Sequence, residues 1–279
     1  MGAELNEPET TNLAKVVRSA TDQGFTVILD PHDKGRYFGE VVGGPKVTAE
    51  NFADFWRKLA EKFADNSLAW FGLMNEPHDM PGEGTKDDAW ANAVRAATVA
   101  IRKAGATNMI LVPGTNWSHA DTYDTKGDYP QILAQIDGEN VGDKLTNYAF
   151  EVHQYLDDDG SGKHSQVKSP TVGSERIARF TEWCRKHHVK AFLGELAAPG
   201  DLDGRRAVQD MLWAMEKDRD VWLAFTWWAA GVKWEPDYMF SLEPKDDRKD
   251  RPQMAYLLPH LHRPETAQKH QPARTLPRS

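Results

Sequence analysis

The chain has 279 residues with 34 basic and 42 acidic side chains, which gives a formal net charge of −8. A content of 40% hydrophobic and 27% charged residues is typical of a globular domain, and no apolar stretch reaches the roughly 18 to 20 residues that cross a membrane. The acidic balance and the lack of a long lysine and arginine block argue against nucleic acid, so we expect neither nucleic-acid nor membrane binding.

Six short apolar runs predict buried strands, because they are rich in β-branched and aromatic residues. Amphipathic segments between them have apolar residues at helical spacing and predict helices that pack one face inward. Strand and helix alternate about every 40 residues, an order typical of parallel βαβ units. The helical spacing also predicts that Trp56, Trp90, Trp183 and Trp213 lie in the core. The predicted strands cover residues 25–29, 69–74, 109–112, 148–152, 191–193 and 223–227.

Chemically functional side chains follow each predicted strand. In a (β/α)8 barrel the carboxyl ends of all strands meet at one mouth, whereas an open sheet would spread these side chains along its edge. No G-x-G-x-x-G motif follows the first strand and no G-x-x-x-x-G-K-[ST] motif occurs, which argues against a nucleotide-binding sheet. We therefore predict an α/β fold of the (β/α)8 TIM barrel type. The side chains in question are Asp30, His32, Asn75, Glu76, Asn116, Trp117, His153, Tyr155, Glu195, Trp227 and Trp228.

Two glutamates stand directly beyond buried strands, Glu76 in LMNEPHD and Glu195 in FLGELAA. A carboxylate at a water-poor barrel mouth needs a partner or a chemical task. A single glutamate of this kind is more often structural. A facing pair can divide acid and base roles, since the charge of one carboxylate raises the proton affinity of the other. This logic is typical of glycosidases and makes Glu76 and Glu195 the predicted catalytic residues.

Six ordered segments over residues 25–244 resemble glycoside hydrolase family 5, and within it the endo-β-1,4-glucanase (cellulase) branch. The resemblance implies a barrel with catalytic acids after strands 4 and 7. Residue by residue, Glu76 matches the acid/base, Glu195 the nucleophile and Asn75 the asparagine that binds the sugar 2-hydroxyl. The other matching pocket positions are His32, His153, Tyr155 and Trp228. The segments are ILDPHDKGRYFG, WFGLMNEP, GTNWSHA, EVHQYLDDDGSG, FLGELAA and TWWAAG, followed by DYMFSLEP.

These residue types suit retaining hydrolysis, which needs two carboxyl groups about 5 to 5.5 Å apart. Tyr155 would keep Glu195 ionised if it donates a hydrogen bond to it, and His153 could steady Glu76 or a leaving-group hydroxyl. We expect no cofactor and no metal, because H-E-x-x-H and cysteine clusters are absent from the sequence. The acidic run 157–160 lacks the final glutamate of an EF-hand and predicts a solvated loop.

The expected substrate is a β-glucan polysaccharide or a cello-oligosaccharide. Sugar rings have flat apolar faces, which indole rings bind with few rotatable bonds to freeze. Trp228, Trp117 and Trp234 are the candidate platforms, in that order. The position of Trp227 fits a platform and the barrel wall about equally, because neighbouring strand residues point in opposite directions.

The sequence departs from the family at the start of the barrel. The first strand that it predicts, residues 25–29, corresponds to strand 3 of the family's eight-stranded barrel. Two β/α units, worth roughly 60 residues, are therefore expected to be missing, together with the arginine that family members place near the nucleophile after strand 2. Three explanations stay open: a misassigned start in a longer secreted enzyme, a natural truncation repaired by homo-oligomer formation, or a decayed paralogue. We favour the first, so secretion of the full-length form is expected although no signal peptide is visible.

The sequence thus predicts one catalytic barrel domain over residues 1–261 and a disordered tail over residues 262–279. The predicted activity is a retaining endo-acting hydrolysis of internal β-1,4-glucosidic bonds. A β-mannanase or another β-glucanase is the alternative on the same scaffold, since fold and catalytic pair do not define the sugar. A truncated, non-catalytic carbohydrate-binding relic is the alternative outside the enzymes.

Overall fold

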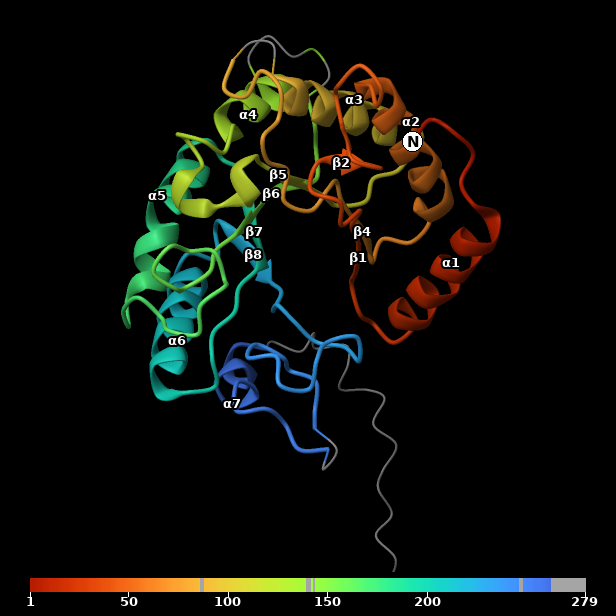
Figure 1. Cartoon of the computed structure of the whole chain (residues 1–279). Helices are drawn as coiled ribbons and strands as arrows, with labels where there is room; N and C mark the ends of the chain where they lie inside the picture. The colour runs from red at the N-terminus through yellow and green to blue at the C-terminus, as the bar shows by residue number, and fades with distance from the viewer. Residues whose placement is uncertain (86–87, 139–141, 143, 246–247, 262–279) are drawn as a thin grey trace, which may run out of the picture.

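Six parallel strands form one sheet, in the order β1-β4-β5-β6-β7-β8. A computed structural model of the chain describes residues 1–85, 88–138, 142, 144–245 and 248–261. The sheet curls into an open arc, with its concave side facing the middle of the molecule (Figure 1). All six predicted strands are present. They are β1 (Val27–Leu29), β4 (Ala69–Gly72), β5 (Ile110–Pro113), β6 (Tyr148–His153), β7 (Lys190–Glu195) and β8 (Trp222–Phe225).

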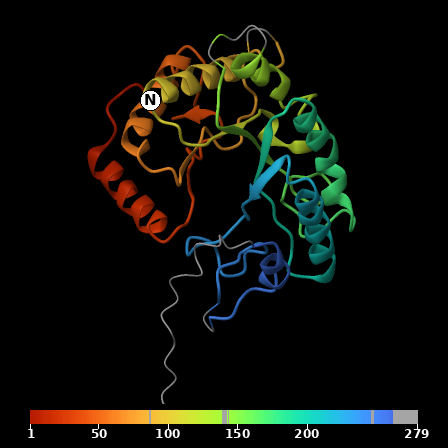
Figure 2. The same cartoon turned by 180° about the vertical axis from the view of Figure 1, so that it is seen from behind.

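Helices cover the convex side of this arc, as the view from behind also shows (Figure 2). Several begin at a side-chain cap: Thr48 and Asn51 form a capping box at α2, and Asp88 and Asp201 accept backbone N–H groups at α3 and α6. The long helices are α1 (Glu7–Thr21), α2 (Ala49–Phe63), α3 (Ala89–Lys103), α4 (Tyr129–Asp137), α5 (Val172–Lys186) and α6 (Leu202–Lys217). The shorter elements are the antiparallel pair β2 (Arg36–Tyr37) and β3 (Glu40–Val41), the 3-10 turns η1 (Asn116–Ser118), η2 (Ala120–Thr122) and η3 (Leu258–His260), and α7 (Met254–Leu257).

The inner strands, β4 to β7, bury side chains on both faces. Their outward residues pack against the helices in the main core, where Trp56 and Trp90 are fully buried and donate their indole N–H groups to the carbonyls of Leu73 and Pro113. Their inward residues form a smaller cluster around Leu111, Ala149 and Phe192. The curled parallel sheet with helices on its outside is the architecture of a barrel wall.

The expectation of a buried Trp213 is wrong, because this side chain is 57% exposed. The buried stripe of α6 includes Val208, Leu212 and Met215. Trp213 follows Leu212 by one residue, a rotation of about 100° around the helix that takes it off the stripe. Trp183 is partly buried against the core, as predicted.

Both ends of the arc are open within the described part of the chain: β1 pairs only with β4, and β8 only with β7. A groove of about 690 Å³ runs along β8 and α6, lined by Leu212, Trp222, Leu223 and Phe225 among others. A second groove, of about 470 Å³, lies along β1, α1 and α2. The predicted tail, 262–279, lies outside the described residues. None of the helices in the described ranges is long and apolar enough to cross a lipid bilayer.

Candidate active site

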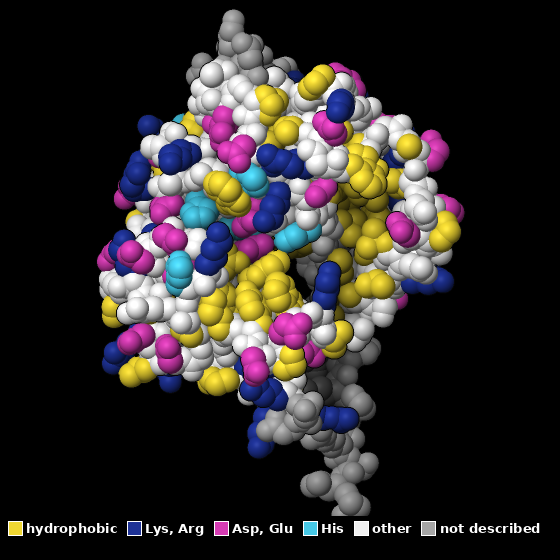
Figure 3. All heavy atoms as spheres, viewed as in Figure 1, with side chains coloured by type: hydrophobic (Ala, Val, Ile, Leu, Met, Phe, Trp, Pro, Cys, Tyr) yellow, Lys and Arg dark blue, Asp and Glu magenta, His cyan; other side chains and the backbone are white. Residues whose placement is uncertain are grey.

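The candidate catalytic side chains meet at the carboxyl ends of β4, β6 and β7. Glu195 is the last residue of β7 and His153 the last residue of β6, and the two are register partners across the parallel pair. Glu76 lies just beyond β4, where its backbone takes a left-handed φ of 42°. In the space-filling view, histidine and acidic side chains gather near the middle of this face, and apolar side chains border the hollow beside them (Figure 3).

Glu76, His153 and Glu195 form a compact triad. The Nδ1 atom of His153 lies 3.0 Å from Oε1 of Glu76 and 3.5 Å from Oε2 of Glu195. One side-chain oxygen of each glutamate and one imidazole nitrogen all lie within 4.8 Å of one another. The structure therefore brings the two predicted catalytic carboxylates close together, as retaining hydrolysis requires.

Tyr155 orients the second carboxylate. Its hydroxyl donates a 2.6 Å hydrogen bond to Oε2 of Glu195, and both residues are buried. The tyrosine ring is held by stacking on Phe240. A short hydrogen bond to a charged acceptor is stronger than one between neutral groups, so this contact fixes the position of the Glu195 carboxylate.

Burial and neighbouring charges shift the pKa values of the three triad residues in different directions. Burial raises the pKa of Glu195 above its ordinary value, and the charge of Glu76 adds to this, although His153 and Tyr155 oppose it. Burial also opposes ionisation of Glu76, but the hydrogen bond and charge of His153 outweigh it and lower the pKa of Glu76. Burial alone would lower the pKa of His153, yet the surrounding carboxylates raise it well above its ordinary value. These shifts favour the protonated form of His153 and the ionised form of Glu76.

Asn75 places a free amide donor in the site. The residue is buried, and its backbone N–H donates to the carbonyl of Pro31. Its side-chain Nδ2 is buried without a hydrogen-bond partner. A buried donor left unpaired costs about 1 to 3 kcal/mol, so the position suits a group that receives its partner from a bound molecule.

An aromatic wall continues from the triad. The rings of His32 and Trp228 stack at 5.4 Å with an interplanar angle of 6°, and Trp234 packs edge-on against Trp228 at 5.1 Å. Asp30 accepts a hydrogen bond from Nδ1 of His32, and this contact raises the pKa of that imidazole. Trp234 in turn stacks on Tyr238 at 4.6 Å.

Trp117 lies apart from this wall, on η1 after β5. It is 38% exposed and stacks on His78 at 4.4 Å. For Trp227, the sequence left a sugar platform and a place in the barrel wall equally open. The structure favours the wall, because the indole N–H donates to the carbonyl of Phe240 and the ring packs on Tyr256.

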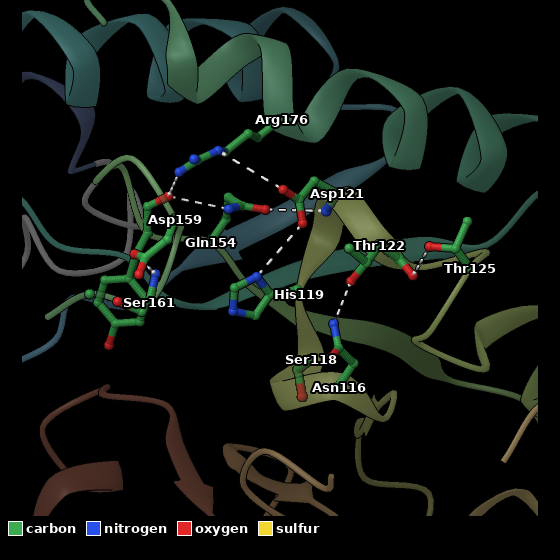
Figure 4. Close-up of polar contacts among 12 residues, drawn as sticks. Asn116, Ser118, His119, Asp121, Thr122, Thr125, Gln154, Asp159, Ser161 and Arg176 are labelled. Atoms are coloured by element: carbon green, nitrogen blue, oxygen red, sulfur yellow. Dashed lines mark hydrogen bonds and ion pairs between the residues drawn. The ribbon is translucent and has the colours of Figure 1, made fainter. Parts of the chain in front are cut away.

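A polar network joins the segment after β5 that contains His119 and Asp121 to Gln154, which follows β6 (Figure 4). The backbone N–H of Asp121 donates to Gln154, and the Asp121 carboxylate faces both His119 at 3.6 Å and Arg176 at 4.0 Å. Arg176 also donates to the backbone carbonyl of Tyr155. These contacts fix the loop from which Tyr155 reaches Glu195.

Among the residues that the structure describes, two clusters contain groups that could hold a cation. The triad itself is one, but Glu76 is already hydrogen bonded to His153, and Glu195 to Tyr155. The other comprises Asp157, Asp159 and His164, where the Asp157 carboxylate accepts backbone N–H groups from Gly162 and His164 and so closes its own loop. The absence of a metal requirement stays a prediction.

Comparison with known proteins agrees with this geometry. The family model described as cellulase (glycosyl hydrolase family 5) matches residues 2–231. The chain belongs to this family. The family 5 chain is 38% identical over 246 residues to endo-beta-1,4-glucanase B of Aspergillus niger, an alignment that covers 88% of this chain and 69% of the relative.

Solved structures resemble this family 5 chain over most of its length. An endo-beta-1,4-glucanase from Xanthomonas axonopodis pv. citri superposes with a TM-score of 0.85 at 38% identity, covering 93% of this chain and 80% of that one. XacCel5A in complex with cellopentaose gives 0.84 at 39% identity, with coverage of 93% and 81%. The predicted family is thus confirmed, and with it the barrel class of the fold.

Several residues near the site were not predicted from the sequence. Tyr238 extends the aromatic wall, His78 backs Trp117, and Glu151 lies beneath His153 at 3.6 Å. Lys34 contributes positive charge that favours the ionised form of Glu76. The sequence contains a signal for two of these residues. His78 lies two residues after Glu76 in NEPHD, and Lys34 lies two residues after His32 in DPHDKG, so both could have been predicted to lie near the site.

Proposed function

We propose that this family 5 chain is a retaining endo-β-1,4-glucanase that cleaves internal bonds of cellulose or related β-glucans. The observation that carries the proposal is the approach of Glu76 and Glu195 to within 4.8 Å, with one histidine against both carboxylates. Curated relatives named endo-beta-1,4-glucanases and a neighbour solved with cellopentaose support the choice of substrate class.

The reaction proceeds by two displacements. In the first, a carboxylate oxygen of Glu195 bonds to the anomeric carbon, the glycosidic C–O bond breaks, and the leaving oxygen takes a proton from Glu76. In the second, Glu76 takes a proton from water, the water oxygen bonds to the anomeric carbon, and Glu195 leaves as a carboxylate. The anomeric configuration is retained after two inversions.

His153 supplies the proton that Glu76 needs. An imidazolium beside an ionised Glu76 holds as many protons as a neutral imidazole beside a protonated Glu76. Transfer along the 3.0 Å contact between Nδ1 and Oε1 therefore converts the resting site into the reactive one without a change in net charge. The hydrogen bond from Tyr155 keeps Glu195 ionised and oriented during this transfer.

The remaining side chains bind sugar. The unpaired amide of Asn75 is the donor for a sugar hydroxyl next to the reacting carbon. His32 and Trp228 form a stacked surface for the apolar face of one ring, Trp234 extends it, and Trp117 serves a more distant ring. No cofactor takes part, so we expect hydrolysis to be insensitive to EDTA.

Hydrolysis assays test the proposal directly. Carboxymethylcellulose should lose viscosity faster than reducing ends accumulate, because an endo-acting enzyme cuts within chains. Proton NMR of early cello-oligosaccharide products should show the β-anomer first. Faster release of sugar from mannan than from β-glucan would favour the mannanase alternative. Binding of cello-oligosaccharide without any release of sugar would favour the non-catalytic alternative.

Residues 1–261 form the catalytic domain in this proposal, with β1 corresponding to the third strand of an eight-stranded barrel. The two further β/α units would lie between β8 and β1, where both edges are open and each is lined by an apolar groove. Among the described residues, His153 is the cationic group within ion-pair distance of Glu195, and no arginine is. An arginine from those units would stand near Glu195. We also propose that the full-length form is secreted.

A further inference from the structure

Glu151 is a largely buried carboxylate next to His153 of the triad. It precedes His153 by two residues on β6, so both side chains point to the same, concave face of the sheet. Its Oε1 lies 3.6 Å from Nε2 of His153, and the two side chains are 15% and 3% exposed. His153 thus has a carboxylate against each ring nitrogen: Glu151 at Nε2, and the catalytic pair at Nδ1.

The neighbouring strand leaves room for this pair. A Cβ atom at Gly194 would lie 2.2 Å from Oε1 of Glu151 and 2.9 Å from Nε2 of His153. Position 194 immediately precedes Glu195 in the chain. Any side chain there would displace both the Glu151 carboxylate and the His153 imidazole. The glycine therefore lets the carboxylate and the imidazole lie close to the backbone of β7.

Other charges around Glu151 are few. Burial raises its pKa, His153 opposes this, and Asp30 and His32 beyond β1 contribute smaller effects of opposite sign. Asp30 is itself occupied by the hydrogen bond from His32. The hydroxyl of Tyr129, from α4, donates to the backbone carbonyl of Glu151 and not to its carboxylate. His153 is therefore the main partner of the Glu151 side chain.

We infer that Glu151 is a positioning residue that directs Nδ1 of His153 toward Glu76 and stabilises the proton that the imidazole holds. The inference rests on the proposed function for its consequence in catalysis, but the contact with His153 can be tested without turnover. Two unit charges 3.6 Å apart at the edge of a protein interior interact strongly enough to move an imidazole pKa by about one unit or more.

Histidine side-chain NMR measures this interaction in the intact chain. Of the 10 histidines, His153 is identified by the signal that disappears in His153→Gln. In the parent protein we expect His153 to stay charged well above the pH at which an exposed histidine titrates. Glu151→Gln keeps the size of the side chain and removes its charge, and it should lower the titration midpoint of His153 by about one pH unit or more. Glu151→Asp should recover most of that shift.

The pH dependence of kcat/KM distinguishes a positioning role of Glu151 from a purely structural one. The alkaline limb of the pH profile of kcat/KM should move to lower pH in Glu151→Gln, with kcat lowered more than KM is raised. Glu182→Gln removes an exposed charge from α5 and serves as the control, with no change expected. An unchanged midpoint of His153 in Glu151→Gln would overturn the inference, as would an equal loss of activity at every pH. An inactive parent with the expected NMR shift would refute only the proposed function.

Discussion

At the scale of single residues, the two glutamates are chemically unequal although they share one histidine. Glu76 is hydrogen bonded to His153 at 3.0 Å, and Glu195 to Tyr155 at 2.6 Å. Glu76 can therefore exchange a proton with the imidazole, whereas the hydrogen bond from Tyr155 favours the ionised form of Glu195 against the effect of burial. This difference supports the proposal that Glu76 is the acid/base and Glu195 the nucleophile.

Substitution of each glutamate by glutamine should separate these roles. On a polymeric β-glucan, we expect Glu76→Gln and Glu195→Gln each to lower kcat by about 10²-fold to 10⁴-fold or more, while oligosaccharide binding persists. On an aryl cellobioside with a good leaving group, Glu76→Gln should show a rapid burst of phenol followed by slow turnover, because the first step no longer needs an acid. Glu195→Gln should show no burst. A burst in Glu195→Gln and none in Glu76→Gln would mean that the two roles are exchanged.

Tyr155→Phe tests the hydrogen bond to the nucleophile. The hydroxyl stabilises the ionised form of Glu195, so its removal should raise the pKa of Glu195 and move the acidic limb of the kcat/KM profile to higher pH. A hydrogen bond to a charged group is worth about 1.5 to 3 kcal/mol, which corresponds to a loss of roughly 10-fold to 100-fold in kcat/KM.

Tyr148→Phe is the matched control, since it removes a hydroxyl that donates to Asp137 at the opposite end of β6. It should leave the acidic limb unchanged. Equal shifts in Tyr148→Phe and Tyr155→Phe would show that the effect does not come from Glu195.

At the scale of elements, the N-terminal ends of α3 and α4 are linked by two buried aspartates. Asp88 caps α3, and Asp128 stands at the start of α4 with a left-handed φ of 53°. Thr115 donates to Asp128 at 3.0 Å. Burial and the hydrogen bond with Asp88 raise the pKa of Asp128 to about 8, so the pair shares a proton at neutral pH.

This shared proton makes stability depend on pH. An unfolded aspartate has a pKa of about 3.9, so folding takes up a proton between pH 4 and pH 8. The stabilisation is complete below pH 4 and is lost as the pH rises toward 8. Asp128→Asn supplies a permanent N–H donor in place of the proton, and asparagine tolerates a positive φ. We expect the variant to be more stable than the parent at pH 8 by about 1 to 3 kcal/mol, with a smaller difference at pH 5.

Urea denaturation at the two pH values measures the effect. Asp65→Asn, at an exposed aspartate after α2, is the control and should change neither value. If Asp128→Asn destabilises the chain equally at pH 5 and pH 8, the two acids do not share a proton.

The sequence predicts elements and strand ends better than it predicts tertiary contacts. The four inner strands, β4 to β7, bury residues on both faces and are therefore continuously apolar in the sequence, whereas the edge strands β1 and β8 are predicted from β-branched and aromatic content although they are less buried. The positions of Glu76 and Glu195 followed from the rule that parallel strands converge at one mouth. The pairing of Asp88 with Asp128, and of Glu151 with His153, depends on contacts across elements that local patterns do not encode. Trp213 was misplaced because one residue of helical rotation separates a buried from an exposed position.

At the scale of the whole molecule, the open arc leaves two edge strands, β1 and β8, without a partner on one side within the described part of the chain. The edges at β1 and β8 present unpaired backbone groups beside apolar grooves, and such edges pair with other chains unless they are covered. The proposed β/α units would cover both edges at once. Without them, the alternative cover is a second copy of the chain.

Edge association can be tested on the chain of 279 residues. We expect sedimentation velocity to show species larger than the 31.4 kDa monomer at micromolar concentration, increasing with concentration. Leu223 is 37% exposed on the edge strand β8, and Leu223→Lys should shift the population toward monomer, because a lysine on an edge strand opposes pairing. Leu202→Lys makes the same change at an exposed position that does not line the groove beside β8, and it should leave the distribution unchanged. A parent chain that stays monomeric at every concentration would mean that the open edges do not associate and that the described part of the fold is stable with both of them exposed.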